Sequence, residues 1–388
     1  MPRKATVTVQ WAHYQGLSEG YRRSMQDAFM TANPQIQLKI VDTSWDLMHE
    51  KLMSSIARGK PPELSIIDNR WLLELADLDA AVEVTKYVTR QTIDSITPSA
   101  LEASIKGRML ALPIGASARL LAFNSRFTYL APASLEELRA EAIRVHNPPQ
   151  VFGLIMPGKK YGEPGDFCYY LYSAGGDFFA RNQDGSFGEC TVNSPAGVKA
   201  LQFMVELANK DRVVQEGYLE MDRTEAQQVF CKGRAAYVMT GAWIESWLKK
   251  AGADFEVRYG TIPPFAGQKQ SGLIITDSIA MLKGAEYQQE AGLFLDFFYQ
   301  NQWKADFDEQ VGFMPITVAA MNRPRFQTPL YRTLVQASLG AKSWPLIKEW
   351  PEATRIIWDA NLKAFLGQMS AKEALDEAAA RIDRARGL

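Results

Sequence analysis

The first 70 residues alternate between strand and helix patterns, and this alternation restricts the fold more than any other feature. Thr6 to Trp11 alternates apolar and polar side chains, which is typical of a strand, and the apolar stripe from Tyr21 to Phe29 is typical of an amphipathic helix. Further strand patterns cover 36–41 and 64–68, with a helix pattern over 45–58 between them. Strands that alternate with helices predict a parallel sheet covered on both faces, so we expect an α/β fold.

Each of the three predicted strands ends in a loop that carries an aromatic ring and a polar group. Ligands of such sheets bind beyond the carboxyl ends of the strands, so these loops supply candidate binding residues. The candidates are Trp11, His13 and Tyr14 after the first strand, Ser44 and Trp45 after the second, and Asp68 and Asn69 after the third. An alternative stays open for Trp11, which shares the alternation of Val7 and Val9 and would then belong to the core. Trp45 alternatively begins the apolar stripe of its helix, and Asp68 alternatively caps the helix that follows it.

More than one domain is expected, because 388 residues exceed what one hydrophobic core ordinarily organises. Proline and glycine interrupt the strand patterns near Pro113, Pro263 and Pro315, where the chain can change direction. After the first of these breaks, small residues at 115–117 allow close approach to the backbone. We interpret this stretch as the chain leaving one domain and entering another, past a cleft.

The stretch from Gly107 to Asn124, G-R-M-L-A-L-P-I-G-A-S-A-R-L-L-A-F-N, resembles a signature of a known family. It is similar to the G-K-x-Y-A-L-P … L-x-Y-N segment of the extracellular solute-binding proteins of ABC importers, in the maltose-binding-like, sugar-binding branch. The stretches 193–201, 228–241 and 312–315 also resemble this family and occur in the same order. The resemblance implies a two-domain, periplasmic-binding-protein-like fold of type II, with a central ligand cleft and three hinge crossings.

The resemblance further implies the domain boundaries and the function. The N-terminal lobe would comprise 1–113 plus 260–312, and the C-terminal lobe 114–259 plus 313–388. The chain would be a monomeric periplasmic protein that captures a carbohydrate or carbohydrate derivative by hinge closure. It would deliver this solute to the transmembrane subunits of an ABC permease, and it would be neither an enzyme nor a carrier of a metal or cofactor.

Further site residues follow from comparing the sequence with the family pattern. Ser117 stands where relatives often have an aspartate that binds sugar hydroxyls, and Asp277 is a candidate to replace that carboxylate. The remaining candidates are Arg119, Tyr161 in a glycine-rich loop, Gly175 and Gly176 as an anion-binding nest, Trp243 for stacking, Phe313 as a wall, and Arg355. For Gly175 and Gly176 a plain helix C-cap is the alternative, and for Asp277 a turn cap.

Charge and composition exclude several classes of partner. The net charge is -1, which gives no electrostatic reason to bind nucleic acid or an anionic membrane. No apolar run approaches the length of about 20 residues that a membrane span needs. No signal peptide is recognised, since Met1 is followed within a few residues by a strand, so we expect a cytosolic protein or one whose leader was removed. The three cysteines lack C-x-x-C spacing; a Cys168–Cys190 disulfide is possible, but three buried free thiols are favoured.

Catalytic motifs are scarce. Only three histidines occur, and no H-E-x-x-H, G-x-S-x-G, P-loop or G-x-G-x-x-G pattern is present. Three alternatives to a neutral-sugar carrier stay open. The first is a carrier of an anionic solute, such as a phospho- or sulfo-sugar, a sugar acid or a glycerol phosphate, using Arg70, Arg119 or Arg355. The second is a glycoside hydrolase with two carboxylates, and the third is a scaffold with no small ligand.

Overall fold

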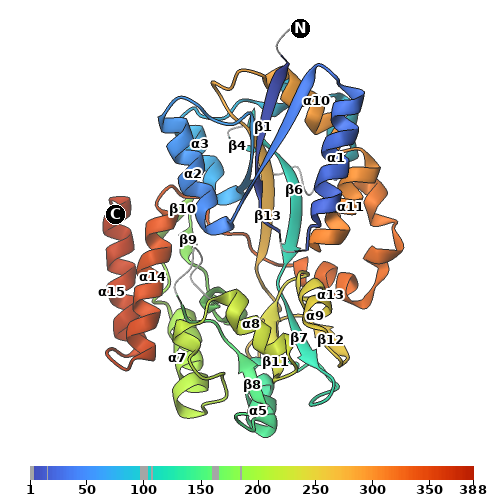
Figure 1. Ribbon diagram of the computed structural model, residues 1–388. Helices are drawn as coiled ribbons and strands as arrows, with labels where there is room; N and C mark the ends of the chain where they lie inside the picture. The colour runs from blue at the N-terminus through green and yellow to red at the C-terminus, as the bar shows by residue number, and fades with distance from the viewer. Residues whose placement is uncertain (1–3, 15, 97–103, 106–107, 160–165, 184–185) are drawn as a thin grey trace. The chain divides into compact units, whose positions relative to one another are not determined.

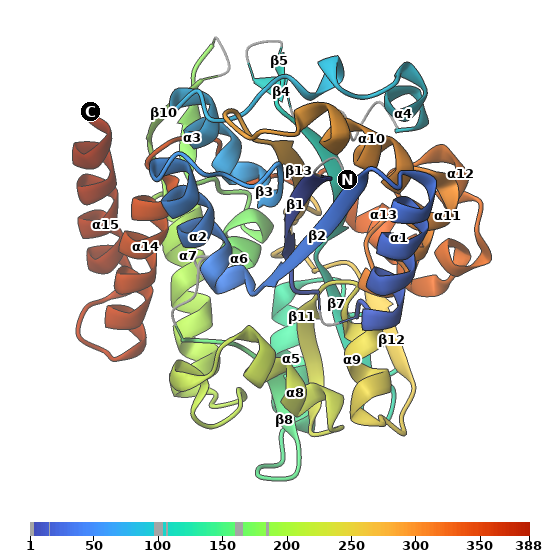
Figure 2. The same cartoon turned by 45° about the horizontal axis from the view of Figure 1, so that its top comes forward.

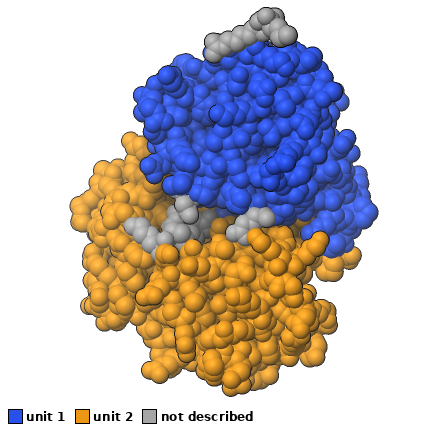
Figure 3. Space-filling view, in the orientation of Figure 1, with its two compact units in different colours: residues 1–117, 275–328 blue, residues 118–274, 329–388 orange. Residues whose placement is uncertain are grey.

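The computed structural model describes residues 4–14, 16–96, 104–105, 108–159, 166–183 and 186–388. The chain forms two compact units, coloured separately in Figure 3, and each unit consists of two separate chain segments. Unit 1 comprises Met1–Ser117 and Ile275–Thr328, and unit 2 comprises Ala118–Ile274 and Pro329–Leu388. The chain therefore passes from one unit to the other after Ser117, Ile274 and Thr328.

Unit 1 is built on a five-stranded mixed sheet with the order β2-β1-β3-β13-β6 (Figure 1). Its strands are β1 (Ala5–Ala12), β2 (Ile36–Thr43), β3 (Leu64–Asp68), β6 (Ala111–Ala118) and β13 (Ile274–Met281). β1 is parallel to β2 and β3, whereas β13 is antiparallel to β3 and places Asp277 opposite Asp68. Its helices are α1 (Glu19–Ala32), α2 (Trp45–Ala57), α3 (Leu72–Asp77), α4 (Arg90–Ser95), α10 (Gln288–Phe298), α11 (Asn301–Val311) and α12 (Val318–Met321). A short ribbon pairs β4 (Ser104–Ile105) with β5 (Arg108–Met109).

Helices cover both faces of the unit 1 sheet, as the α/β prediction requires. α1, α10 and α11 lie on one side of the sheet, and α2 and α3 lie on the other (Figures 1 and 2). Neighbouring residues of β3 point to opposite faces. Ile66 packs into the apolar cluster on the α1 side, while Ile67 packs into the cluster with Leu52 and Leu75. The predicted fold class is therefore confirmed for this unit.

The predicted strand break at Pro113 is wrong, because β6 runs without interruption through Pro113 and Gly115. β6 is the edge strand of the sheet, where a missing backbone N–H costs no ladder bond. The carbonyl of Pro113 accepts a hydrogen bond from the Tyr299 hydroxyl at 2.7 Å. At Gly115, a Cβ atom would lie 2.3 Å from the Phe313 ring, so a glycine is needed to let this ring pack against the strand.

The crossings lie further along the chain than the sequence analysis placed them, after Ser117, Ile274 and Thr328 rather than after 113, 259 and 312. Side-chain packing explains two of these differences. Phe265 packs against Phe203 with ring centroids 5.1 Å apart, which holds the segment after Pro263 in unit 2. Phe313 packs against Phe307 at 5.9 Å, which keeps the third break inside unit 1.

Unit 2 contains a four-stranded mixed sheet with the order β12-β7-β11-β8. Its strands are β7 (Leu120–Asn124), β8 (Phe152–Ile155), β11 (Ala235–Thr240) and β12 (Val257–Gly260), and a separate ribbon pairs β9 (Phe179–Arg181) with β10 (Phe187–Cys190). β11 is parallel to β8 and antiparallel to β7, which is also antiparallel to β12. Its helices are α5 (Leu135–Val145), α6 (Phe167–Ser173), α7 (Pro195–Val205), α8 (Arg223–Cys231), α9 (Ile244–Ala251), α13 (Pro329–Ser338), α14 (Trp350–Phe365) and α15 (Ala371–Arg386).

Aromatic packing and helix contacts complete the core of unit 2. α7 packs against α6, α14 and α15. Phe178 meets Trp350 edge to face at 4.9 Å. All three cysteines are buried and free, which confirms the favoured sequence prediction. Within the described ranges, no helix is both long enough and apolar enough to cross a bilayer.

Candidate functional site

Polar and aromatic side chains gather at one edge of the unit 1 sheet. β1, β2 and β3 are parallel, so their carboxyl ends meet at this edge, and antiparallel β13 begins there. We call Tyr14, Trp45, Asp68, Trp71 and Asp277 the unit 1 edge. The sequence analysis named four of these five residues as candidates. Trp71 was not among the candidates, although an aromatic ring directly after Asp68-Asn69-Arg70 was the available signal.

Tyr14 is the centre of this edge. Its hydroxyl donates a hydrogen bond to Asp277 Oδ2 at 3.0 Å, and its ring meets Trp45 edge to face at 5.9 Å. Burial raises the pKa of Tyr14 well above its ordinary value, and the carboxylates of Asp277 and Asp68 add to this shift. The phenol therefore keeps its proton at physiological pH and acts as a hydrogen-bond donor.

A row of rings continues from Tyr14 along the edge. Trp45 and Trp71 lie 6.1 Å apart between ring centroids, and His49 lies 5.0 Å from Trp71. His49 also contacts Glu74 through Nε2 and Oε2 at 2.6 Å, which fixes its ring. Trp45 and Trp71 are both only partly buried. This row therefore offers exposed apolar surface directly beside polar groups, which is the combination that carbohydrate C–H faces and hydroxyls require.

Asp68 and Asn69 are held by neighbours in unit 1. Asp68 is 6 % exposed, accepts from the backbone N–H of Arg70 at 2.9 Å, and forms an ion pair with the Arg70 guanidinium at 2.6 Å. The capping alternative for Asp68 is thus observed. Asn69 Oδ1 accepts from the Ser278 hydroxyl at 2.6 Å. Because Arg70 already has a carboxylate partner, it is a weaker candidate for binding an anionic solute.

Trp11 is not available to a ligand, which corrects one candidate. The side chain is fully buried and meets Phe298 and Phe307 edge to face at 5.5 and 5.6 Å. The core alternative, based on its alternation with Val7 and Val9, is therefore the correct one. The alternation of apolar residues alone could not decide between a core residue and a ligand contact, because Trp11 also lies near the end of β1 where the candidate residues gather.

His13 and Ser44 lie at the ends of β1 and β2 and are exposed. His13 Nδ1 lies 2.8 Å from Asp42 Oδ2, and the same carboxylate oxygen lies 2.6 Å from Arg22. Although burial opposes the shift, the bonds from Arg22 and His13 lower the pKa of Asp42 below its ordinary value. Ser44 is the N-cap residue of α2, and its hydroxyl makes no capping bond. Both residues stay candidates.

Phe313 and Ser117 are buried at 8 % and 4 % exposure. The Phe313 ring meets Tyr14 edge to face at 5.4 Å and belongs to the core cluster on the α1 side of the sheet. Phe313 therefore packs against the ring of Tyr14 and helps to hold it in place. It does not form an exposed wall of the site, as was predicted. Ser117 is the last residue of the first segment of unit 1.

In unit 2, candidate residues gather around one tryptophan. We call Arg119, Tyr169, Arg223, Gln227 and Trp243 the Trp243 group. Two guanidinium carbons lie over the Trp243 ring, that of Arg119 at 4.6 Å and that of Arg223 at 5.0 Å from the centroid. Arg119 is 4 % exposed and donates from Nε to the Tyr169 hydroxyl at 3.2 Å. The sequence analysis selected Arg119 and Trp243 but could not show that they touch.

The Trp243 ring is held by a hydrogen bond at its ring nitrogen and by close packing against Gly241. Its Nε1 donates to Gln227 Oε1 at 2.9 Å, and the same oxygen accepts from the Thr240 hydroxyl at 2.9 Å. A Cβ atom at Gly241 would lie 2.2 Å from the ring, so this position requires glycine. The group therefore presents guanidinium donors over a rigid aromatic face, which suits hydroxyl, carboxylate or phosphate oxygens.

The backbone at Gly175 and Gly176 is committed to ending a helix. The N–H of Gly175 donates to Tyr172 O at 3.0 Å, and that of Gly176 donates to Leu171 O at 3.0 Å. Gly175 adopts a φ of 77°, as expected of a helix C-cap. The predicted anion-binding nest is thus corrected to the C-cap alternative, since its donors are already used.

Arg355 and Tyr161 complete the predicted residues. Arg355 lies on α14, where its guanidinium pairs with Glu352 at 2.5 Å and with Asp359 at 3.3 Å. Those carboxylates neutralise its charge, which weakens the prediction that it binds an anionic solute. Tyr161 lies outside the described residues. Within those residues, no cluster of His, Cys, Asp and Glu could hold a metal ion.

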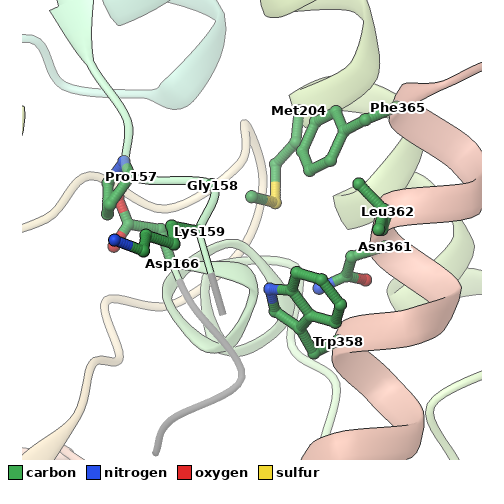
Figure 4. Close-up of a pocket in the computed structure, with 9 residues that line it drawn as sticks. All are labelled: Pro157, Gly158, Lys159, Asp166, Met204, Trp358, Asn361, Leu362 and Phe365. Atoms are coloured by element: carbon green, nitrogen blue, oxygen red, sulfur yellow. The ribbon is translucent and has the colours of Figure 1, made fainter. Parts of the chain in front are cut away.

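Unit 2 also contains a pocket that the sequence analysis did not predict (Figure 4). Its cavity volume is about 20 Å³, which is room for about one water molecule. Its lining comes from α14, from α7 and from the loop between β8 and α6: Pro157, Gly158, Lys159, Asp166, Met204, Trp358, Asn361, Leu362 and Phe365.

Comparison with known proteins places the chain in a family. Residues 24–330 match the sequence model of the bacterial extracellular solute-binding proteins. A protein of Brucella abortus named as a binding protein is 26% identical over 385 residues, covering 97% of this chain and 92% of the relative. The maltotriose-binding protein of Pyrococcus abyssi is 24% identical over 62% of this chain and 50% of its own length. The sn-glycerol-3-phosphate-binding periplasmic protein of Rhizobium meliloti is 25% identical over 52% and 50%.

Solved structures show the same fold. Maltose-bound MalE3 of T. maritima has a TM-score of 0.86 and 21% identity, covering 98% of this chain and 100% of that one. The maltotriose-binding protein of Thermus thermophilus, bound with maltotriose, has a TM-score of 0.84 and 22% identity, covering 98% and 99%. The two-domain α/β prediction is therefore confirmed at the level of the fold.

Proposed function

This chain belongs to the bacterial extracellular solute-binding proteins, and we propose that it captures a carbohydrate or carbohydrate derivative for an ABC importer. The observation that carries the proposal is the unit 1 edge. A neutral phenol at Tyr14, held by Asp277, stands beside the partly exposed rings of Trp45 and Trp71. Rings cover the C–H faces of a sugar, and the polar groups match its hydroxyl rim. The maltose- and maltotriose-binding names of similar proteins support the same solute class.

A second candidate is an anionic solute, such as a phospho- or sulfo-sugar, a sugar acid or a glycerol phosphate. The two guanidinium groups over Trp243 favour it, because planar guanidinium donors match carboxylate and phosphate oxygens. A relative named for sn-glycerol-3-phosphate binding is consistent with this candidate. Arg70 and Arg355, the other two candidates, each form an ion pair with a carboxylate of their own unit.

The remaining features of the proposal concern the setting of the protein. We propose that it acts as a monomer in the periplasm and hands its solute to the transmembrane subunits of a permease. The three chain crossings allow hinge bending, and a solute that binds one hinge state more tightly shifts the population toward that state. A fall in the radius of gyration on adding the solute, measured by small-angle scattering, would support hinge closure.

We also propose that the protein performs no catalysis. A glycosidase needs one carboxyl group that donates a proton to the leaving oxygen. At the unit 1 edge, Asp68 is held in an ion pair with Arg70, and Asp277 accepts a hydrogen bond from Tyr14. Both carboxylates are therefore already engaged with groups of the protein itself. Aryl glycosides should therefore release no phenol when incubated with the protein, and measurable turnover would overturn this part of the proposal.

A thermal-unfolding screen tests the proposed function. The panel contains maltose, maltotriose, D-tagatose, D-glucuronate, sn-glycerol-3-phosphate and, as a control, sodium sulfate. A ligand at about 100 times its Kd stabilises the folded state by about 2.7 kcal/mol, so a true solute raises Tm measurably. A shift with a neutral sugar supports the first candidate, and a shift confined to the anionic compounds supports the second. If no carbohydrate or derivative shifts Tm, the proposal is wrong.

A further inference from the structure

Helix α8 contacts the Trp243 ring at two points. Arg223 and Gln227 are four residues apart on this helix, so they lie on the same face of it. The guanidinium carbon of Arg223 lies 5.0 Å from the centroid of the Trp243 ring, and Gln227 Oε1 accepts from Trp243 Nε1 at 2.9 Å. One helix face therefore contacts both the plane of the ring and its nitrogen.

The amide of Gln227 is itself held in one orientation. Its side chain is buried, its Nε2 donates to Met239 O at 3.1 Å, and its Oε1 accepts from the Thr240 hydroxyl at 2.9 Å. The backbone oxygen of Met239 can only accept a hydrogen bond, so the amide nitrogen must lie on that side, and the amide oxygen is left for Trp243. The strand β11, which carries Met239 and Thr240, therefore fixes the acceptor that the indole uses.

Two tryptophans of the core show that a folded indole does not need such a bond. Trp11 and Trp350 are fully buried, and among the described residues neither Nε1 has a hydrogen-bonding partner. Their rings are held by the side chains packed around them. Trp243 is only partly buried, so packing encloses its ring on fewer sides. The hydrogen bond to Gln227 therefore supplies a constraint on Trp243 that packing supplies for the other two.

A ring that is held in place before the solute arrives favours binding. Immobilising a side chain on binding costs conformational entropy, and a ring that is already fixed avoids this cost. The bond to Gln227 also uses the one hydrogen that an indole can donate. A solute that contacts Trp243 therefore meets the face of the ring with C–H surface, rather than accepting a hydrogen bond from the ring nitrogen.

We propose that Gln227 is a positioning residue, which holds the Trp243 ring ready for a C–H face of the solute without touching the solute itself. Gln227 is 2 % exposed, so its effect on binding passes through the ring that it holds. The inference rests on the proposed capture of a carbohydrate or carbohydrate derivative. It deepens that proposal by assigning the residue that sets the orientation of one binding surface.

Gln227→Leu removes the acceptor, and Gln215→Leu is its matched control. Gln215 is also a buried amide of unit 2, but it accepts from the backbone N–H of Met156 at 3.0 Å and donates to the Met156 carbonyl at 2.8 Å. Both variants leave polar groups unpaired and should lower Tm by about 2–6 °C. Gln227→Met, with a longer apolar side chain, should repeat the result of Gln227→Leu.

The nitrogen-bound proton of the Trp243 ring reports the loss of its partner directly. In the ¹H–¹⁵N spectrum, Gln227→Leu should move this signal upfield, as expected of an indole that has lost a hydrogen bond. Gln215→Leu should leave it in place. The signal is assigned by its absence from the spectrum of Trp243→Phe.

Binding is measured by calorimetric titration with maltose, maltotriose, D-tagatose, D-glucuronate and sn-glycerol-3-phosphate. For a compound that wild type binds, Gln227→Leu should raise the Kd by about 5- to 10-fold, and Gln215→Leu should leave it unchanged. In a Trp243→Phe background, Gln227→Leu should raise the Kd by less than about twofold, because this background lacks the ring nitrogen through which Gln227 acts.

The failures of the two proposals are distinguishable. Equal Kd values for Gln227→Leu and Gln215→Leu would overturn the positioning role while leaving the proposed capture intact. An undiminished effect of Gln227→Leu in the Trp243→Phe background, or an unshifted Trp243 signal in Gln227→Leu, would have the same meaning. If wild type binds none of the five compounds, the proposed function is overturned, and the positioning role with it.

Discussion

The unit 1 edge and the Trp243 group of unit 2 are both aromatic, but their polar groups have opposite character. At the unit 1 edge, carboxylates dominate, and each has a donor next to it: Tyr14 for Asp277 and Arg70 for Asp68. In the Trp243 group, guanidinium donors lie over the ring. Hydroxyl groups both donate and accept, so each of the two surfaces is chemically suited to a carbohydrate. An anionic solute would be suited only to the guanidinium groups of the Trp243 group.

The largest expected effect on binding comes from unit 2. Gly241→Ala places a Cβ where the Trp243 ring lies, 2.2 Å away, and must displace that ring. Loss of a fixed aromatic contact costs about 2 kcal/mol, so we expect the Kd for the solute to rise about 30-fold. Calorimetric titration measures it. Gly272→Ala is the matched control, because a Cβ there has nothing within 4 Å. Equal Kd values for both variants would show that Trp243 does not contact the solute.

An intermediate effect is expected at the unit 1 edge. Tyr14→Phe removes the hydroxyl that donates to Asp277 but keeps the ring against Trp45. A lost hydrogen bond costs about 1 kcal/mol, so we expect about a 5-fold weaker Kd for a neutral sugar. If Tyr14→Phe leaves the Kd unchanged while Gly241→Ala abolishes binding, the solute depends on unit 2 alone. That result would favour an anionic solute over a neutral sugar.

The sequence allowed more of the unit 1 edge to be predicted than of the Trp243 group. Tyr14, Trp45 and Asp68 could be named because the carboxyl ends of parallel strands share an edge. Trp11 lies on β1, shortly before Tyr14, but its side chain faces the core. The alternation of apolar residues did not distinguish a core position from a ligand-binding one. The contact between Arg119 and Trp243 could not be predicted, since it joins residues brought together only by the fold of unit 2.

Backbone context explains two further differences. Pro113 was expected to break a strand, but an edge strand tolerates proline because no partner needs its N–H. Gly175 and Gly176 fitted both a nest and a C-cap by sequence, and only the hydrogen bonds to Tyr172 and Leu171 decide.

Ionic strength should change the Kd for the solute less than these substitutions do. If the solute is a neutral sugar, its Kd should change less than about twofold between about 20 mM and about 500 mM NaCl, because screening acts on charges. The measurement is a calorimetric titration at both salt concentrations. A Kd that rises steeply with salt would indicate that Arg119 and Arg223 bind a charged solute.

The smallest effect concerns Asp42, beside the unit 1 edge. Its pKa is lowered from 3.8 by Arg22 and His13, against the effect of burial, so its ionised form stabilises the folded state. That contribution is complete above pH 3.8 and disappears as pH falls through the lower folded-state pKa. Because the carboxylate is 33% exposed, Asp42→Asn should cost only a few tenths of a kcal/mol, on the order of 0.5. Tm measured at neutral pH should show the loss, and Tm measured in strong acid should not.

Hydrogen exchange measured by mass spectrometry, with and without the sugar that raises Tm most, tests the central claim most directly. We expect slower exchange in the peptides that carry Tyr14, Asp68–Trp71 and Gly241–Trp243, and unchanged exchange in α15. Protection confined to other segments, or no protection with any carbohydrate, would contradict the claim that these residues capture a sugar.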